Sequence, residues 1–321
     1  MASTTTTTGS TLAPPSQVAT PVPSLSSSIS PSPETSRLPT PVGNARPTVV
    51  SSASMSPPPS ENGLITPRAS SPLTLPKTDQ YDPRGTLPNT VLAVAVCATV
   101  LGATCASSLS FVLRPYLEVI AGSWARPQLG LYISAVALFH LLEFFTTAGW
   151  NPLKLSIDSF LLNNGRQYHM AHCFGLVEYF ISSLFFPSKF QASWSSFPIL
   201  AIVTAVMVGA QAVRSLAMIQ AAQSFSHIVK NKKHDDHVLV THGLYSWSRH
   251  PSYTGFFYWA VATQLLLGNV VSTLGFIIVL SRFFSARIID EERHLVRFFG
   301  NDYVEYRKRV GTKLPFFFAP A

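Results

Sequence analysis

The feature that most constrains the fold is a series of long apolar segments that fills the chain from about residue 88 onward. A helix that crosses the hydrocarbon core of a bilayer needs about 20 predominantly apolar residues. Six segments meet or approach that length, and they cover residues 89–113, 128–149, 169–187, 197–220, 252–267 and 270–284. The last two are short and are separated only by Gly268 and Asn269, which predicts a tight helical hairpin. We therefore expect an all-α, polytopic integral membrane protein with about six transmembrane helices.

The composition separates this region from a polar N-terminal region. Only 12% of the 321 residues are charged and 47% are hydrophobic, whereas soluble domains carry about 25% charged residues. Residues 1–86 are rich in Ser, Thr and Pro, and 17 of the 25 prolines lie before residue 89. Such a segment buries too little apolar surface to offset the entropy of ordering it. We predict a disordered cytosolic tail over residues 1–86, without a cleavable signal peptide, and a membrane domain over residues 87–321.

Basic residues are concentrated outside the apolar segments. One group lies between the fourth and fifth segments and the other in the C-terminal region: they comprise Lys230, Lys232, Lys233 and Arg249, and then Arg287, Arg293, Arg297, Arg307, Lys308 and Arg309. The positive-inside rule places both groups in the cytosol, and an even number of spans then places the N-terminus there as well. The net charge of +8 is better explained by attraction to anionic lipid headgroups than by nucleic-acid binding.

The cysteines and histidines do not form a recognisable metal or disulfide pattern. All three cysteines, Cys97, Cys105 and Cys173, lie inside apolar runs, and there is no CxxC pair. A group of histidines falls close together, comprising His227, His234, His237, His242 and His250, but no HExxH motif or cysteine partner accompanies it. We therefore expect neither a disulfide nor a metal site.

The segment 237–255 holds an unusual density of polar and ionisable residues between two apolar blocks. Ionisable groups at a membrane boundary indicate a functional site. His250 and Pro251 predict the start of a helix, whose free amides would favour a carboxylate or phosphate. Trp247 and Trp259 are typical of the aromatic belt at a membrane interface, but Arg249 and His250 side by side are not explained in that way.

Charged residues also fall in and just beyond the predicted spans. Arg287 and Glu291 would share one face of a helix over residues 287–299 that ends at Gly300, before a second short helix over 301–310. The pair is either a surface ion pair or a cation and an anion displayed toward the loop. Glu143 and Glu178 lie within predicted spans, so both should face the bundle interior. We favour hydrogen bonds to neighbouring helices over action on a substrate.

Several motifs occur in a specific order. They are His237-Val-Leu-Val-Thr-His-Gly-Leu-Tyr245, Arg249-His-Pro-Ser-Tyr-Thr-Gly255, Arg282-Phe-Phe, Arg287, Asp290-Glu-Glu292, Phe298-Phe-Gly300, Tyr303 and Leu314-Pro-Phe316, preceded by Asn151-Pro152 and Asp158-Ser-Phe-Leu-Leu-Asn163. An RHPxYxG fragment alone indicates a wider group of membrane methyltransferases and sterol reductases. The full series resembles the isoprenylcysteine carboxyl methyltransferase family, over roughly residues 127–318.

The resemblance implies an enzyme of the endoplasmic-reticulum membrane. It would transfer a methyl group from S-adenosylmethionine to the C-terminal carboxylate of a farnesylated or geranylgeranylated cysteine in processed C-a-a-X proteins. A cytosolic cofactor pocket would be formed by the 221–251 loop and the C-terminal helices. The implied cofactor contacts are Lys230, His237, Val238, Leu239, Val240, Tyr245, His250, Pro251, Ser252, Tyr253 and Glu291. Arg287 would be the catalytic and substrate-binding residue. Lys230 stands where relatives have a glutamine.

Other functions remain open from the residues themselves. A phospholipid methyltransferase would act on an amine, which needs deprotonation, and His250 would be its candidate base. A sterol-type reductase would bind NADPH through a cationic site for the 2′-phosphate. A non-catalytic membrane scaffold would use the loop as a partner site. The oligomeric state and the preferred prenyl chain are likewise open.

Overall fold

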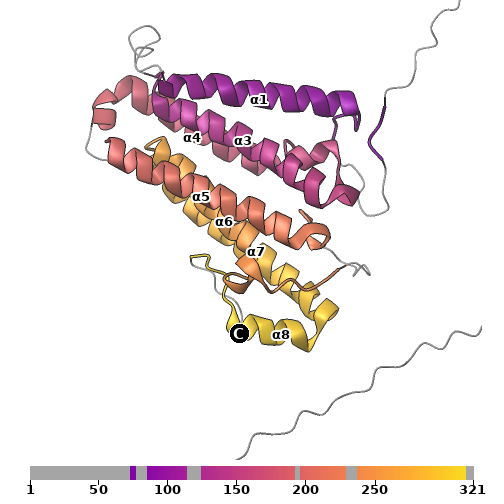
Figure 1. Ribbon diagram of the computed structural model, residues 1–321. Coiled ribbons are helices and arrows are strands. Elements are labelled where there is room, and N and C mark those ends of the chain that lie inside the picture. Colours follow the sequence, from indigo (N-terminus) through magenta and orange to yellow (C-terminus); the bar gives the residue numbers. More distant parts are fainter. Residues whose placement is uncertain (1–72, 77–84, 114–123, 192–195, 229–236, 316–321) are drawn as a thin grey trace, which may run out of the picture. The chain divides into compact units, whose positions relative to one another are not determined.

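The computed structural model describes residues 73–76, 85–113, 124–191, 196–228 and 237–315, which are helical apart from connecting loops (Figure 1). The longer helices are α1 (Val91–Leu113), α3 (Pro127–Trp150), α4 (Arg166–Phe185), α5 (Phe197–Ala221), α6 (Pro251–Leu266), α7 (Val270–Phe299) and α8 (Asn301–Arg309). Short 3₁₀ helices join them: η1 (Pro152–Lys154), η2 (Ile157–Phe160), η3 (Pro187–Gln191), η5 (Ala222–Ser224) and η6 (Gly243–Ser246). The all-α prediction is confirmed over this part of the chain, whereas residues 1–72 of the predicted tail lie outside it.

Among the described helices, four are long and apolar enough to cross a membrane: they cover Val91–Val112, Pro127–Trp150, Phe197–Ser224 and Val270–Phe299. Helices α4 and α6 occupy the other two predicted spans. Helix α6 has 16 residues, fewer than the roughly 20 that cross a bilayer core without help, and α4 opens with the polar sequence Arg-Gln-Tyr-His. The chain is a multi-pass membrane protein.

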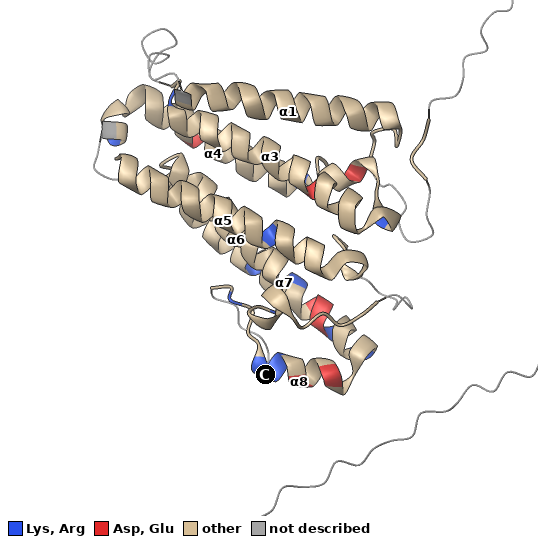
Figure 2. Ribbon diagram, in the orientation of Figure 1, with Lys and Arg blue, Asp and Glu red and all other residues tan. Residues whose placement is uncertain are grey.

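One helix boundary that was predicted from the sequence is wrong, and it falls inside α7. A span over 270–284 and a separate helix over 287–299 were expected, but α7 runs unbroken over 30 residues. No Gly or Pro occurs between Phe276 and Phe299, so nothing interrupts the helix where its composition changes. At about 45 Å, α7 is longer than the roughly 30 Å hydrocarbon core. Charged residues gather on its C-terminal part and on α8, whereas α1 carries none (Figure 2).

Close approaches between helices shape the bundle. Helix α1 lies along α3, and α5 lies along α6 (Figure 1). A Cβ atom at Gly255 would lie 2.7 Å from the Ala210 carbonyl oxygen and 2.7 Å from the Arg214 nitrogen. Only a glycine allows α5 and α6 to pack so closely.

The α6–α7 hairpin is confirmed. Gly268 has a φ of 70°, a left-handed conformation that favours glycine. The Asn269 side-chain amide donates to the Gly175 carbonyl at 2.7 Å. Glu178 on α4 accepts hydrogen bonds from the Val271 and Ser272 amides at 3.0 and 2.7 Å, so its predicted interhelical role is also confirmed.

The main apolar core lies between α3, α4, α5, α6 and α7. Trp259 is at its centre, with 1% of its surface exposed, and its ring stacks on Phe139 at a centroid distance of 4.7 Å. The prediction that Trp259 is an interfacial anchor is therefore wrong, because its face of α6 packs against α3. Trp247 lies in the loop and is 48% exposed.

Candidate functional site

The loop before α6 is anchored on the end of α5. Gly243 adopts a φ of 60° at the start of η6, a left-handed conformation that favours glycine. The Leu244 amide donates to Gln220 Oε1 at 2.8 Å, and the Tyr245 hydroxyl donates to the Ala217 carbonyl at 3.3 Å. A Cβ atom at Gly243 would lie 2.6 Å from the end of the Gln220 side chain, so a larger residue would displace the glutamine that accepts from the Leu244 amide.

The segment after α8 returns to the same loop. The Ser248 hydroxyl donates to the Thr312 carbonyl at 2.7 Å, and the Arg249 amide donates to the Gly311 carbonyl at 3.0 Å. The Tyr306 hydroxyl on α8 donates to the Tyr245 carbonyl at 2.5 Å. Burial raises the pKa of Tyr306 to about 12, so this hydroxyl remains a donor at physiological pH.

A buried charge cluster lies beneath the loop. The Arg249 Nε donates to Glu292 Oε1 at 2.8 Å, and His250 Nε2 lies 3.1 Å from the same oxygen. Glu292 is 5% exposed. The motif Asp290-Glu-Glu292 contains Glu292, but sequence reasoning assigned a role only to Glu291. Helical spacing was the available signal for Glu292. Ile288 lies four residues before Glu292 and therefore on the same helix face, and Ile288 is fully buried.

Tyr253 connects the two residues that were expected to face the loop. Its hydroxyl donates to Glu291 Oε2 at 2.6 Å and accepts from Arg287 Nε at 2.8 Å. The Arg287 guanidinium also lies 5.5 Å from the centre of the Tyr253 ring. Arg287 and Glu291 therefore do share a helix face, but a tyrosine hydroxyl bridges them, and the arrangement is more than a surface ion pair.

A cavity opens between the loop, the start of α6 and the C-terminal part of α7. Every predicted cofactor contact within the described residues lines it: His237, Val238, Leu239, Val240, Tyr245, His250, Pro251, Ser252, Tyr253 and Glu291. Lys230 lies outside the described residues. Arg287 is not part of the lining, although it is bonded to Tyr253, which is.

Other lining residues were missed by sequence reasoning. They include Phe225, Ser226 and Ile228 after α5, Leu295, Phe298 and Phe299 on α7, and Tyr303 and Tyr306 on α8. Phe298 and Phe299 lie in the Phe298-Phe-Gly300 motif that carries the family resemblance, but the sequence analysis assigned them no role in a cavity. Together these side chains give the cavity an apolar and aromatic wall opposite its polar groups.

The start of α6 adds a further electrostatic element. The helix begins at Pro251, as expected, so the amides of its first turn lack partners within the helix. Such an end attracts anions, and Pro251 and Ser252 place it at the cavity wall. Glu291 provides a negative group on another part of the wall. The cavity thus presents both signs of charge beside an apolar surface.

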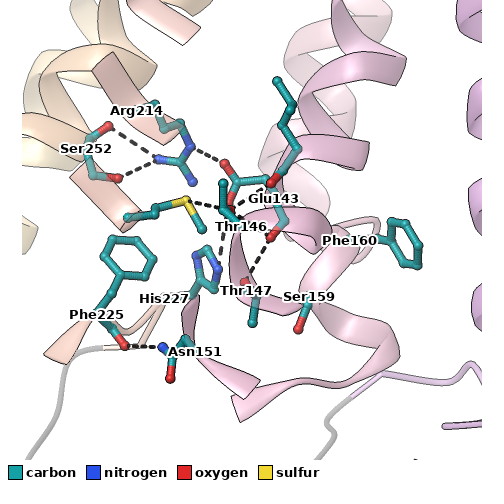
Figure 3. A network of polar contacts seen from close by, with 12 residues as sticks. Glu143, Thr146, Thr147, Asn151, Ser159, Phe160, Arg214, Phe225, His227 and Ser252 are labelled. Carbon is teal, nitrogen blue, oxygen red and sulfur yellow. Dashed lines mark hydrogen bonds and ion pairs between the residues drawn. The ribbon is translucent and has the colours of Figure 1, made fainter. Parts of the chain in front are cut away.

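A network of polar contacts continues from the cavity into the bundle (Figure 3). Glu143 on α3 is 1% exposed and pairs with Arg214 on α5, as the interhelical role predicted from sequence requires. Arg214 in turn reaches Ser252. Among the described residues, no group of three or more His, Cys, Asp or Glu side chains is placed to hold a metal ion.

Comparisons with known proteins agree with this geometry. The model of the isoprenylcysteine carboxyl methyltransferase (ICMT) family matches residues 201–297. A protein-S-isoprenylcysteine O-methyltransferase of Saccharomyces cerevisiae is 47% identical over 212 residues, which are 64% of this chain and 89% of the relative. That of Schizosaccharomyces pombe is 43% identical over 241 residues, 72% of this chain and 98% of the relative.

The fold agrees as well. A solved structure of the eukaryotic intramembrane Ras methyltransferase ICMT is 37% identical, with a TM-score of 0.64, and the match covers 70% of this chain and 77% of that chain. The chain belongs to the isoprenylcysteine carboxyl methyltransferase family.

Proposed function

We propose that the chain methylates the C-terminal carboxylate of a prenylated cysteine, with S-adenosylmethionine as the methyl donor. The observation that carries the proposal is the cavity itself: motif residues separated in sequence line one space beside Arg287. Relatives of 47% and 43% identity bear the name protein-S-isoprenylcysteine O-methyltransferase. The substrates would be processed C-a-a-X proteins that carry a prenyl chain.

The cavity fits S-adenosylmethionine chemically. Glu291 offers a carboxylate for the donor's positively charged groups, and the start of α6 favours its carboxylate. Leu239, Leu295 and Phe298 supply apolar surface for the adenine ring. The predicted contacts from His237 to Val240, at Tyr245, from His250 to Tyr253 and at Glu291 are therefore proposed as the cofactor site. The proposed contact of Lys230 rests on the family motif alone.

The reaction needs alignment more than proton transfer. An α-carboxyl group has a pKa near 3.5, so it is already ionised at neutral pH and needs no general base. The carboxylate oxygen forms a bond to the methyl carbon as the carbon–sulfur bond breaks, which gives a methyl ester and S-adenosylhomocysteine. Holding the two reactants in line is worth about 7–11 kcal/mol in well-oriented systems.

Arg287 is suited to holding the acceptor. Its Nε donates to the Tyr253 hydroxyl and its Nη2 to the His227 carbonyl, which orients the guanidinium. Among the described residues, its Nη1 has no hydrogen-bond partner, so donors remain for a carboxylate. Arg287 lies beside the cavity and is not part of the lining. This position suits a residue that binds the acceptor while the cofactor occupies the cavity.

We also propose the membrane arrangement that the sequence predicts. Six spans would include α4 and α6, and both termini would lie in the cytosol of an endoplasmic-reticulum membrane. The charged end of α7 and the basic last turn of α8, with Arg307, Lys308 and Arg309, would then lie at the cytosolic surface with the cavity. This orientation follows the positive-inside rule.

One assay tests the proposal. Membranes that contain the full chain are incubated with methyl-labelled S-adenosylmethionine and N-acetyl-S-farnesylcysteine, and base-labile methyl ester is measured. Label in phospholipid but not in ester would instead support the amine methyltransferase, and label in neither product would refute both.

Arg287→Ala should lower kcat/KM for the acceptor at least 100-fold, while Arg293→Ala, on an exposed part of the same helix, should stay within twofold of the wild type. Near-normal ester formation by the Arg287→Ala variant would remove Arg287 from its proposed role.

A further inference from the structure

A buried ion pair lies outside the cavity, between Glu143 on α3 and Arg214 on α5. Their side chains are 1% and 7% exposed, and Arg214 Nε donates to Glu143 Oε1. The guanidinium also lies 5.2 Å from the ring centres of both Phe139 and Phe256. Charges inside a membrane bundle are costly and usually mark function. A buried ion pair is weak evidence for stability, because an apolar pair of similar volume often stabilises as well.

The first connection of this pair runs to the cofactor side of the cavity. Arg214 Nη1 lies 3.2 Å from Ser252 Oγ and 3.4 Å from the Ser252 carbonyl oxygen. Ser252 is 4% exposed and lies in the first turn of α6, where it lines the cavity. Figure 3 shows the contacts between Arg214 and Ser252. Through them the guanidinium holds the helix start on which the proposed cofactor site depends.

The second connection runs to the substrate side. Glu143 Oε2 lies 3.7 Å from His227 Nε2, and the His227 carbonyl accepts the hydrogen bond from Arg287 Nη2. Burial lowers the pKa of His227 to about 4, so the ring is neutral at physiological pH. Among the described residues neither Glu143 Oε2 nor His227 Nε2 has a hydrogen-bond partner, so the contact between His227 and Glu143 is dipolar. The same stretch is held from α3 and η1, because Asn151 and Lys154 donate to the Phe225 carbonyl at 3.0 and 2.7 Å.

We propose that Glu143 is a positioning residue for methyl transfer: through Arg214 it holds Ser252 at the cofactor site, and through His227 it supports the carbonyl that orients Arg287. The inference rests on the proposed function. Glu143 touches neither reactant in this arrangement. Its carboxylate contacts both Arg214 and His227, so its loss should disturb cofactor binding and acceptor alignment together.

The central test removes both charges at once. A single substitution leaves an uncompensated buried charge and endangers folding, whereas the double variant Glu143→Leu/Arg214→Met keeps apolar volume without a lone ion. The full chain is reconstituted in lipid. The thermal midpoint, the Kd for S-adenosylhomocysteine by calorimetry, and kcat with N-acetyl-S-farnesylcysteine are measured. We expect a midpoint close to wild type, a Kd about 10-fold weaker, and kcat lower by about 10- to 100-fold, the effect of a misplacement near 1 Å.

Two further variants distinguish the loss of these connections from a general loss of bundle stability. Arg214→Lys keeps a positive charge beside Glu143 but loses the forked donors, so it should weaken S-adenosylhomocysteine binding more than it lowers kcat. Glu178→Gln alters another carboxylate within the bundle, one that caps α7 instead. This variant should leave the Kd for S-adenosylhomocysteine and kcat within twofold of the wild type.

The outcomes are distinguishable. A folded double variant, or an Arg214→Lys variant, that matches an active wild type in both Kd and kcat overturns the inference and leaves the proposed function intact. Equal losses in the Glu178→Gln control also overturn it, because bundle stability alone would then explain the effect. A wild type that neither binds S-adenosylhomocysteine nor forms ester overturns the inference and the proposed function together.

Discussion

The clearest stability prediction concerns Arg249, which joins three separate segments. Its Nε donates to Glu292 on α7, and its Nη1 donates to the carbonyls of Arg307 and Val310 around the end of α8. The side chain is 6% exposed. Arg249→Met keeps most of the volume but leaves the Glu292 carboxylate and two carbonyls without their donor.

The magnitude follows from these contacts. Removing one partner of a buried ion pair costs about 3–5 kcal/mol, and each orphaned acceptor adds a penalty of about 1–3 kcal/mol unless water reaches it. His250 still faces Glu292 at 3.1 Å, and Arg307 and Val310 are only partly buried, so water can reach their carbonyls and we expect about 4 kcal/mol in total. For a domain of this size, 1 kcal/mol shifts the melting temperature by about 2–4 °C. The variant should therefore melt about 8–16 °C lower.

The assay is thermal unfolding of the reconstituted chain followed by tryptophan fluorescence. Lys308→Met is a matched control, because it breaks an ion pair with Glu305 whose side chains are 65% and 52% exposed. Exposed pairs contribute roughly 0–1 kcal/mol, so its midpoint should move by less than about 4 °C. If Arg249→Met lowers the midpoint no more than this control, Arg249 does not hold the C-terminal segment in the way described here.

Further predictions address the helix contact, the buried histidine and the tyrosine bridge. Gly255→Ala should destabilise by about 1–3 kcal/mol through overpacking, whereas Gly275→Ala, with nothing within 4 Å of its new Cβ, should be neutral or slightly stabilising; equal melting temperatures would contradict this. The pKa of His227 is lowered to about 4 from roughly 6.5 in an unfolded chain. The folded state therefore binds fewer protons between these values, and stability should fall as the pH drops from about 6.5 toward 4. His227→Gln should flatten that slope in pH-dependent unfolding, and an unchanged slope would exclude His227 as its source. Tyr253→Phe should reduce kcat about 10-fold because it removes the bridge between Arg287 and Glu291, and a kcat within twofold of wild type would argue against that bridge.

Local patterns in the sequence anticipated much of the site. Gly243 at a turn, Pro251 at a helix start and Gly300 at a helix end each follow from backbone preferences of single residues. The predicted cofactor contacts within the described residues line one cavity, and their role in cofactor binding stays a prediction. The boundary placed inside α7 was wrong, since a change from apolar to charged composition does not end a helix that lacks Gly and Pro.

The sequence by itself determined that the chain is helical, spans a membrane and carries one clustered set of polar motifs, because helix periodicity and apolar length are local properties. Only the tertiary structure decided which buried charges meet. Arg249 and Glu292 are 43 residues apart, and Glu143 and Arg214 are 71 apart. Their pairing depends on which helices approach each other, as at Gly255, and on which face each helix turns inward. That choice is made by packing over the whole bundle, which no short pattern encodes.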